Sequence, residues 1–349
     1  MDINLELVEK ILNKKSKVTN KYISSTETVI CLYDFFCINN IKICEKIKEN
    51  YNLPNNYLII NDYNQISINE INEKKYNYNT NINNKYVLLE YNSENHLDFY
   101  NFLFNLPNPK LFIFHLLDSY EFLLNSLLKL QEINVCFFNL SVKNVVFTKK
   151  YKPILQNFET SLLLDKCSNI EYFLKMFDKI DDYVCKPIEI HVIFYLIKNN
   201  EDSLSFSSID SICNNFIKNT EILSLFSQNF KEEYYKTCMD CLKKYINKPK
   251  IEIIKLILTY SNTWDNYELS ILYLHIIGKS TTTFLLKDTF MNKLILILTK
   301  NIGGNPTTRN TIIETINHLD ILFYEYSNWD YINLIPHEKM KNLYYNLLK

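Results

Sequence analysis

The sequence contains no alanine, a single arginine (Arg309) and only three glycines (Gly278, Gly303 and Gly304) among 349 residues. Phosphate-binding loops such as GxGxxG and GxxxxGK[ST] need closely spaced glycines, because only glycine adopts their backbone conformations freely. Neither pattern occurs in this chain, so the usual glycine-rich cradles for nucleotide phosphates are excluded. Asparagine is instead about one residue in seven, a bias expected from A+T-rich coding.

Charge of neither sign is in excess, because 38 basic and 39 acidic residues leave a formal net charge of −1. The lysines are spread among the acids, which excludes the basic stripe of a nucleic-acid binder. The start of the chain lacks the apolar core of a secretory signal, and no uncharged apolar run reaches the roughly 18 residues of a membrane span. We therefore expect a cytoplasmic protein that binds no nucleic acid and has no membrane span.

The nine cysteines occur at irregular spacings, which indicates reduced thiols rather than a disulfide framework. Cys238 and Cys241 form a C-x-x-C pair, but no second pair or nearby histidine completes a zinc site. Two thiols packed along a helix are the favoured interpretation, and a bound metal is the alternative.

Apolar spacing predicts a small sheet-bearing part at the start of the chain. Residues 4–16 and 38–50 have helical spacing, whereas 28–36, 57–62 and 85–92 are rich in β-branched and aromatic residues and predict strands. With 47% apolar residues, the chain can bury a sizeable core.

Long helices dominate the pattern after residue 95. Residues 111–131 are apolar around most of the helix circumference, which is typical of a helix at the centre of a domain. Short apolar strands and a polar loop follow, and from about residue 188 the pattern is mostly helical. The expected fold class is α+β, with a reduced N-terminal part and a large helical C-terminal part.

The segment after the central helix resembles the core of eukaryotic protein kinases. Phe137-Phe138-Asn139 and Asn144 stand where the family has H-R-D-x-x-x-x-N, and Asn157-Phe158-Glu159 stands where it has D-F-G. The 13 residues from Asn144 to Asn157 match the family's usual gap. The resemblance implies a two-lobe kinase-like fold in which Phe137 and Phe158 belong to an internal spine.

Further matches follow in the family's order. Residues 186–189 (KPIE) correspond to A-P-E, residues 264–273 to the D-x-W-S-L-G helix, and residues 306–309 (PTTR) to the late P-x-x-R. The resemblance implies that Asp265 holds backbone amides of the catalytic loop. It also implies that Arg309 forms a bidentate pair with a buried Glu189.

The positions that carry phosphoryl-transfer chemistry in the family are degenerate. The base position is Asn139 and the metal-binding position is Asn157, and an amide supplies neither a base nor the negative charge that magnesium requires. Only Asn144 matches its motif. Ser141 replaces the lysine that follows the base, and Phe138 replaces the arginine before it.

The start of the kinase-like segment lacks other nucleotide-binding groups. The family's β3 lysine aligns with Leu32, and its usual glutamate partner corresponds to Glu45 or Glu49, which we expect on a solvated face. The resemblance assigns the hinge and adenine pocket to four positions: Leu89, Glu90, Tyr91 and Val146. We expect no cofactor, and ATP with magnesium is the alternative, with Glu159 as its metal ligand.

Two departures in length complete the comparison. About 75 residues separate Glu189 from Asp265, far more than the family places there, which predicts a helical insertion over 190–262. The expected division is 1–92 for the reduced N-lobe and hinge, 93–189 and 263–349 for the helical lobe. The reduced N-lobe and biased composition are similar to kinase-like proteins of giant DNA viruses of protists, which implies a host cytoplasm or virion location.

The sequence predicts a catalytically inactive kinase-like domain, a pseudokinase, that binds protein partners as a scaffold. The insertion and the C-terminal helices are the expected contact surfaces. Aromatic residues of the insertion form either a partner patch or a subdomain core: Phe216, Phe226, Phe230, Tyr234 and Tyr235. The alternatives are an active atypical serine/threonine kinase that uses Asn144 and Glu159, and a helical structural or virion protein without nucleotide binding.

Overall fold

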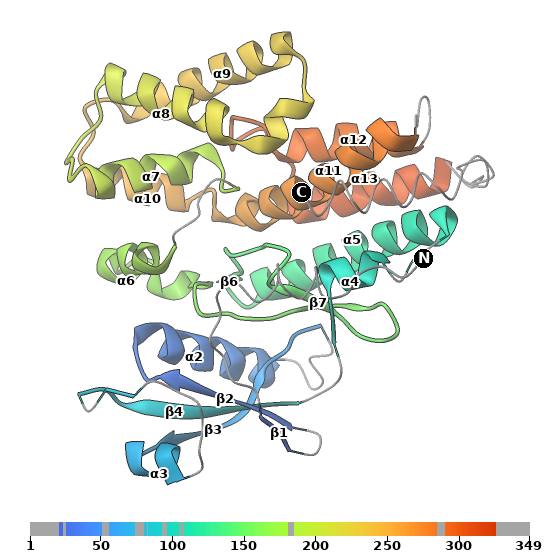
Figure 1. Ribbon diagram of the computed structural model, residues 1–349. Helices are drawn as coiled ribbons and strands as arrows, with labels where there is room; N and C mark the ends of the chain where they lie inside the picture. Colours follow the sequence, from blue (N-terminus) through green and yellow to red (C-terminus); the bar gives the residue numbers. More distant parts are fainter. Residues whose placement is uncertain are drawn as a thin grey trace.

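The computed structural model describes residues 21–23, 26–50, 56–73, 80–81, 83–92, 96–104, 106, 108–180, 185–284 and 290–325. The helix expected at residues 4–16 lies outside these described residues. The described fold is α+β and mostly helical, which confirms the predicted fold class. The N-terminal sheet lies at the bottom of Figure 1, and helices fill the middle and top.

The N-terminal sheet is antiparallel and has the strand order β1-β2-β4-β3. Its strands are β1 (Lys21–Ile23), β2 (Thr26–Leu32), β3 (Ile60–Ile66) and β4 (Tyr86–Asn92). Helix α2 (Phe35–Asn50) connects β2 to β3 and covers the face nearer the helical part, whereas α3 (Ile68–Glu73) lies at the far side (Figure 1).

Side chains of the sheet alternate between these two faces, as the pleat of a strand requires. Cys31 and Leu89 belong to the main core, whereas Ile30 and Leu88 pack against a small separate cluster around Ile71.

Two predicted strand boundaries were wrong. The run 28–36 predicts a single strand, but β2 ends at Leu32 and α2 begins at Phe35. The Asp34 carboxylate accepts a hydrogen bond from the Cys37 amide at 2.9 Å, so it caps the helix and ends the extended segment. The next strand starts later than the predicted 57–62, because Tyr57 forms a bridge with Leu155 instead of joining the N-terminal sheet. It ends later because the middle of β3 is exposed and polar and gives no apolar signal.

The central helix expected over 111–131 is α5 (Pro109–Glu132). It packs against α11 (Trp264–Phe284) and α13 (Ile312–Glu325). The Asn108 side chain accepts a hydrogen bond from the Lys110 amide, and Pro109 begins the helix. By length and composition Lys110–Glu132 also meets a criterion for membrane spans, a test that buried core helices pass as well. Leu116, Leu123 and Leu127 of α5 are fully buried in the protein core.

Short strands outside the N-terminal sheet lie on both sides of α5 in the sequence, one before it and four after it among the described residues. A three-stranded sheet contains β5 (Leu97–Asp98), β7 (Val145–Phe147) and β8 (Pro153–Leu155), while β6 (Val135–Cys136) pairs with β9 (Leu162–Leu163). Phe102 of α4 (Phe99–Phe104) stacks on Phe147 with ring centroids 3.7 Å apart, which fixes β7 against the helical part.

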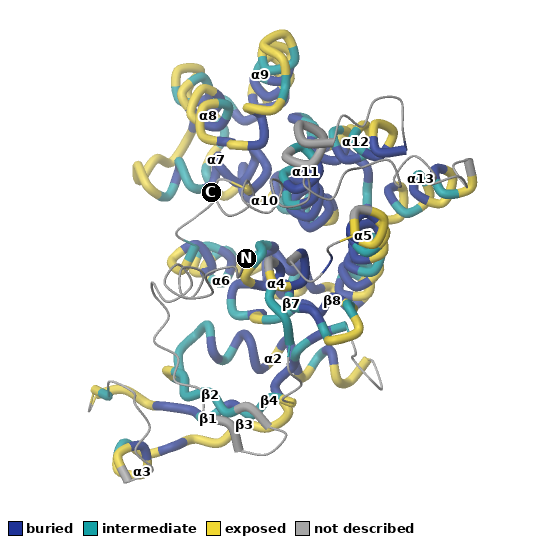
Figure 2. Tube along the Cα trace, turned by 45° about the vertical axis from the view of Figure 1, so that its right-hand side comes forward, coloured by how far each residue is buried: buried dark blue, intermediate teal, exposed yellow. Residues whose placement is uncertain are grey.

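Helices make up the rest of the described chain. They are α6 (Ile170–Met176), α7 (Ile188–Lys198), α8 (Phe206–Asn219), α9 (Gln228–Leu242), α10 (Lys250–Leu258), α11 (Trp264–Phe284), α12 (Phe290–Asn301) and α13 (Ile312–Glu325). Helices α7 to α10 gather at one end of the molecule, beside α11 and α12 (Figures 1 and 2). The predicted insertion is therefore helical.

The aromatic residues of the insertion form a packed core rather than an exposed patch. Phe216 is fully buried and Tyr234 is 6% exposed, while Phe226, Phe230 and Tyr235 are half-buried against the same cluster. The insertion also packs closely on the rest of the chain, because a Cβ added at Gly304 would lie 2.7 Å from the Cys238 sulfur.

A buried network of neutral polar groups joins α5, α11, α12 and α13. The Asn266 amide donates to the Asn310 carbonyl at 2.9 Å and to the Thr315 hydroxyl at 2.8 Å. The Asn301 amide donates to the Ser270 hydroxyl at 3.0 Å and accepts from the Asn310 amide at 2.8 Å. The Asn301 amide also donates to the Tyr120 hydroxyl of α5 at 3.4 Å. Each buried amide therefore has hydrogen-bond partners, and the network fixes how the four helices pack together.

Candidate functional site

The polar loop 137–144, named here the asparagine loop, is held by a buried carboxylate. Asp265, at the start of α11, accepts hydrogen bonds from the Phe137 amide at 2.9 Å and from the Phe138 amide at 2.8 Å. The resemblance implies this contact. Burial and the neighbouring Glu268 raise the pKa of Asp265 to about 6, although the two amides and the Cys136 thiol oppose the shift.

A second buried anchor holds the same loop, and the sequence analysis missed it. Glu268 accepts a hydrogen bond from the Leu140 amide and pairs with Lys186, both at 2.8 Å. The Lys186 ammonium also donates to the Phe138 carbonyl at 2.6 Å and lies 4.4 Å from the centre of the Phe138 ring. The sequence could have indicated this anchor, because Glu268 lies one helical turn after Asp265 and therefore on the same face of α11.

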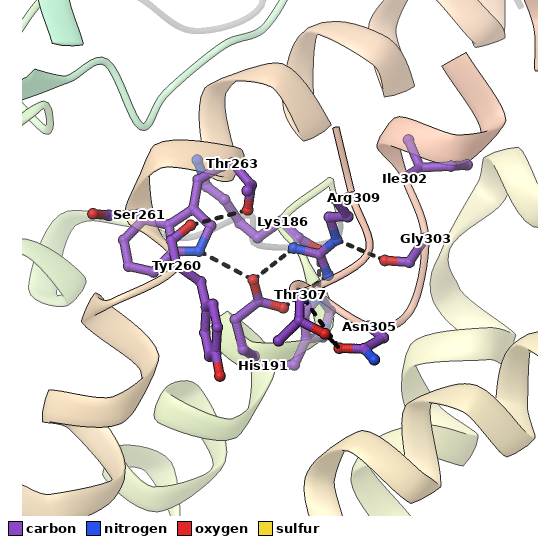
Figure 3. Close-up of polar contacts among 12 residues, drawn as sticks. Lys186, His191, Tyr260, Ser261, Thr263, Ile302, Gly303, Asn305, Thr307 and Arg309 are labelled. Carbon is purple, nitrogen blue, oxygen red and sulfur yellow. Dashed lines mark hydrogen bonds and ion pairs between the residues drawn. The ribbon is translucent and has the colours of Figure 1, made fainter. Parts of the chain in front are cut away.

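Arg309 and Glu189 form a fully buried ion pair. The guanidinium donates to both Glu189 carboxylate oxygens, at 2.6 and 2.9 Å. Its Nε donates to the Gly303 carbonyl at 2.6 Å (Figure 3). The Trp264 indole adds a third donor to Glu189, at 3.1 Å. Both charged groups therefore have hydrogen-bond partners, as burial of an ion pair requires.

The three candidate asparagines lie on neighbouring segments. The Asn144 side chain donates to the Asn139 carbonyl at 2.7 Å, which ties the two ends of the asparagine loop together. The Gln156 backbone amide donates to the Asn144 carbonyl at 3.0 Å. Asn157 is the next residue after this contact, so its segment lies beside the asparagine loop. Asn157 is exposed and has a left-handed backbone (φ 63°).

The segment 157–161 is fixed by contacts from α2. The Asn39 side-chain amide lies near three backbone carbonyl oxygens of this segment, at 3.5 Å from Phe158, 3.2 Å from Glu159 and 2.8 Å from Ser161. The Tyr172 hydroxyl donates to the side-chain oxygen (Oδ1) of Asn39 at 2.9 Å. Neither residue was predicted from the sequence, because its partners are far away in the chain.

The Glu159 carboxylate forms an ion pair with a lysine side chain. Its carboxylate pairs with Lys179, and the Lys179 ammonium lies 5.0 Å from the centre of the Phe36 ring. Near this pair, burial raises the pKa of Cys31 to about 12, with a smaller contribution from Glu159. A metal ion at Glu159 would have to compete with Lys179.

The positions that the resemblance assigns to nucleotide contacts lie on β2 and β4. Leu32 is 36% exposed and follows Cys31, whose side chain packs on the α2 side, so a lysine at position 32 would point away from segment 157–161. Leu89, Glu90 and Tyr91 lie within β4, which pairs with β2 on one side and β3 on the other. The backbone of these three residues therefore has a paired strand on each side.

The remaining expected positions have structural surroundings. Val146 is half-buried in β7 and pairs with Ile154 of β8. Phe158 is fully buried, with its ring 5.4 Å from Phe137 and 6.1 Å from Tyr57. Glu45 and Glu49 are exposed on α2.

The possible metal ligands are few. Within the described ranges, no group of three or more His, Cys, Asp or Glu side chains is arranged to hold a metal ion. Cys238 and Cys241 are buried on α9, and burial raises the pKa of both thiols.

Comparison with known proteins gives no family model that matches the chain and no matching curated protein.

Proposed function

We propose that this chain is a degenerate member of the protein-kinase fold family, a pseudokinase that acts as a protein-binding scaffold. The observation that carries the proposal is the contrast between the asparagine loop and its anchors. Asp265, Glu268 and Lys186 hold the loop backbone by four hydrogen bonds of 2.6 to 2.9 Å, whereas the positions for base and metal carry the amides Asn139 and Asn157.

The arrangement of elements supports the kinase-like assignment. An antiparallel sheet with one helix between its second and third strands precedes a long buried helix, a polar loop and a paired-strand hairpin. The Glu189–Arg309 pair then links the segment after this hairpin to the C-terminal helices. The described part of the chain has four strands before residue 93. A helical structural protein, the alternative, is not expected to have them.

The loss of catalysis follows from charge. Magnesium bound to nucleotide phosphates needs carboxylate ligands, and the proton of a substrate hydroxyl needs a base. Asn139 and Asn157 supply neither, and the Glu159 carboxylate is paired with Lys179. The asparagine loop keeps its shape through contacts that need no nucleotide.

Calorimetric titration of the purified chain with ATP, with and without magnesium, tests this function. We expect no magnesium-dependent binding and no transfer of radiolabelled phosphate to the chain or to a generic acceptor. An Asn139→Asp/Asn157→Asp double variant, checked for folding by circular dichroism, shows whether the two amides alone prevent metal-dependent binding. Magnesium-dependent binding by the parent chain that is lost in Glu159→Gln would instead support the active-kinase alternative.

The scaffold surface is tested by point substitutions rather than by deletion of residues 190–262. Deletion would expose the main core, because Cys238 and Tyr234 pack against residues 302–304. Phe206 and Ile251 are 57% and 56% exposed at the start of α8 and α10, so they are suitable positions. Phe206→Ser and Ile251→Ser should leave stability within about 0.5 kcal/mol while weakening partner capture through the insertion.

A further inference from the structure

A cluster of lysines and exposed apolar side chains lies where the β7–β8 turn meets the first turns of α5. The ring of Tyr151 in the turn is 5.0 Å from the ring of His115, which is 5.3 Å from the ring of Phe114. Figure 1 shows the turn running alongside α5 at the same side of the molecule. We call this surface the basic turn patch, and its members are Lys110, Leu111, Phe114, Lys149, Lys150 and Lys152.

Large apolar side chains of this patch are exposed. Phe114 is 59% and Leu111 is 47% exposed, although both belong to a helix whose opposite face is fully buried. A phenylalanine exposed beside a second apolar side chain indicates a contact surface rather than a core position.

The charge of the patch is positive. Its four lysines are all exposed. The nearest acid on α5 is Asp118, one turn after Phe114, and Glu121 and Asp320 lie close to it on the side away from Lys110. Asp98 is the acid nearest the turn in sequence, and its carboxylate accepts two hydrogen bonds from Asn101. The four lysines at the turn and at the start of α5 therefore form the positive end of this surface, which complements a surface of negative charge.

The turn presents its lysines in a fixed position. The Thr148 carbonyl accepts the Tyr151 amide at 2.9 Å, and the Thr148 hydroxyl accepts the amides of Lys150 and Lys152 at 3.3 and 3.2 Å. Tyr151 has a left-handed backbone (φ 61°), and its ring packs 6.0 Å from Phe102. Lys149 and Lys150 therefore form the tip of an ordered turn.

We propose that the basic turn patch binds the surface of a membrane that contains anionic lipids. The lysines contact lipid phosphates and carboxylates, while Phe114 and Leu111 enter the boundary between headgroups and acyl chains. The rest of α5 stays in the protein core, so the protein lies on the membrane and does not cross it. This inference is independent of the proposed pseudokinase function.

Sedimentation of the full chain with phosphatidylcholine vesicles, with and without phosphatidylserine, tests the proposal. We expect binding only to the anionic vesicles, and weaker binding at high salt because ions screen the lysines. Lys149→Ala/Lys150→Ala should lower the partition coefficient about 25-fold, since each lysine near such a surface contributes about 1 kcal/mol, or about fivefold. Phe114→Ala should lower it about tenfold.

Matched controls lie elsewhere on the surface. Phe206 is 57% exposed, an exposed fraction similar to the 59% of Phe114. Lys198 and Lys218 are exposed at the ends of α7 and α8. Phe206→Ala and Lys198→Ala/Lys218→Ala should bind vesicles as the parent does. Equal binding to neutral vesicles, equal losses in the controls, or unchanged binding by Phe114→Ala would each overturn the proposal. Loss in the lysine variant alone, matched by an equal loss of RNA binding, would identify a non-specific polyanion contact instead.

Discussion

Arg309 and Glu189 are joined by two parallel hydrogen bonds, and both side chains are fully buried. The one arginine of the chain thus lies where two carboxylate oxygens, the Gly303 carbonyl and the Tyr267 ring surround it. Lysine cannot replace it, because an ammonium lacks the planar fork that matches a carboxylate.

Removal of one member of this pair should destabilise the fold strongly. We expect Arg309→Leu or Glu189→Leu to lower the free energy of unfolding by about 3–5 kcal/mol, because a buried charge then loses its partner. Urea denaturation measures this change. The double variant Arg309→Leu/Glu189→Leu should be more stable than either single variant, and strict additivity of the two losses would contradict the argument.

The second anchor of the asparagine loop should control the protection of its backbone. Lys186→Met removes the donor to the Phe138 carbonyl and leaves Glu268 without its cation. We expect a loss of about 3–5 kcal/mol and faster amide hydrogen exchange at Phe138 and Leu140. Lys179→Met, which breaks the partly exposed pair with Glu159, is the control and should cost less than about 1 kcal/mol.

Stability should depend on pH through Asp265. Its pKa in the folded state is about 6, above the 3.8 of an unperturbed aspartate, so the folded protein binds more protons between these values. Stability from this group is therefore largest at low pH and falls as pH rises from about 4 to about 6, by about 3 kcal/mol in total. Urea denaturation across this range should show a steeper decline for the parent than for Asp265→Asn. Parallel profiles would contradict the assignment.

The contact from α2 to segment 157–161 should also be measurable. Asn39→Ala removes the amide shared by the Phe158, Glu159 and Ser161 carbonyls, and we expect a loss of about 1–3 kcal/mol. Limited proteolysis should then cut near Glu159 faster. Tyr172→Phe removes only the hydroxyl that orients Asn39, so its effect on both readouts should be smaller.

Thiol reactivity should separate one cysteine from the rest. All nine cysteines lie in the described part of the chain, and Cys185 is exposed while the others are buried or half-buried. Burial raises the pKa of Cys37, Cys44 and Cys167 to about 12, so few thiolates form there at neutral pH. Alkylation of the native protein, followed by mass spectrometry, should label one site rapidly and none rapidly in Cys185→Ser.

Sequence patterns predicted what depends on local spacing. The apolar circumference of 111–131 predicted the buried helix α5, and β-branched residues predicted β4 almost to its ends. The boundary at Asp34 was missed because the apolar run continues through the helix cap into α2. Apolar character alone does not separate a strand from the first turn of a helix.

Long-range polar contacts were harder to predict. Lys186 and Glu268 are separated by 82 positions, and Asn39 by 119 or more from its carbonyl partners, so no local spacing relates them. Arg309 and Glu189 were paired in the sequence only through the resemblance to kinases. Asn139, Asn144 and Asn157 were assigned in the same way, and the structure brings their segments together without testing their chemistry.

The buried amides and hydroxyls around Asn301 carry no net charge, unlike the anchors of the asparagine loop. Acid or salt therefore acts on the two regions unequally. Protonation changes Asp265, whereas Asn266, Asn301 and Asn310 keep the same donors and acceptors at every ordinary pH. As pH rises from about 4 to about 6, the Asp265 anchor should lose stability while the neutral contacts among α11, α12 and α13 stay unchanged, so the asparagine loop and the helical end respond to pH separately.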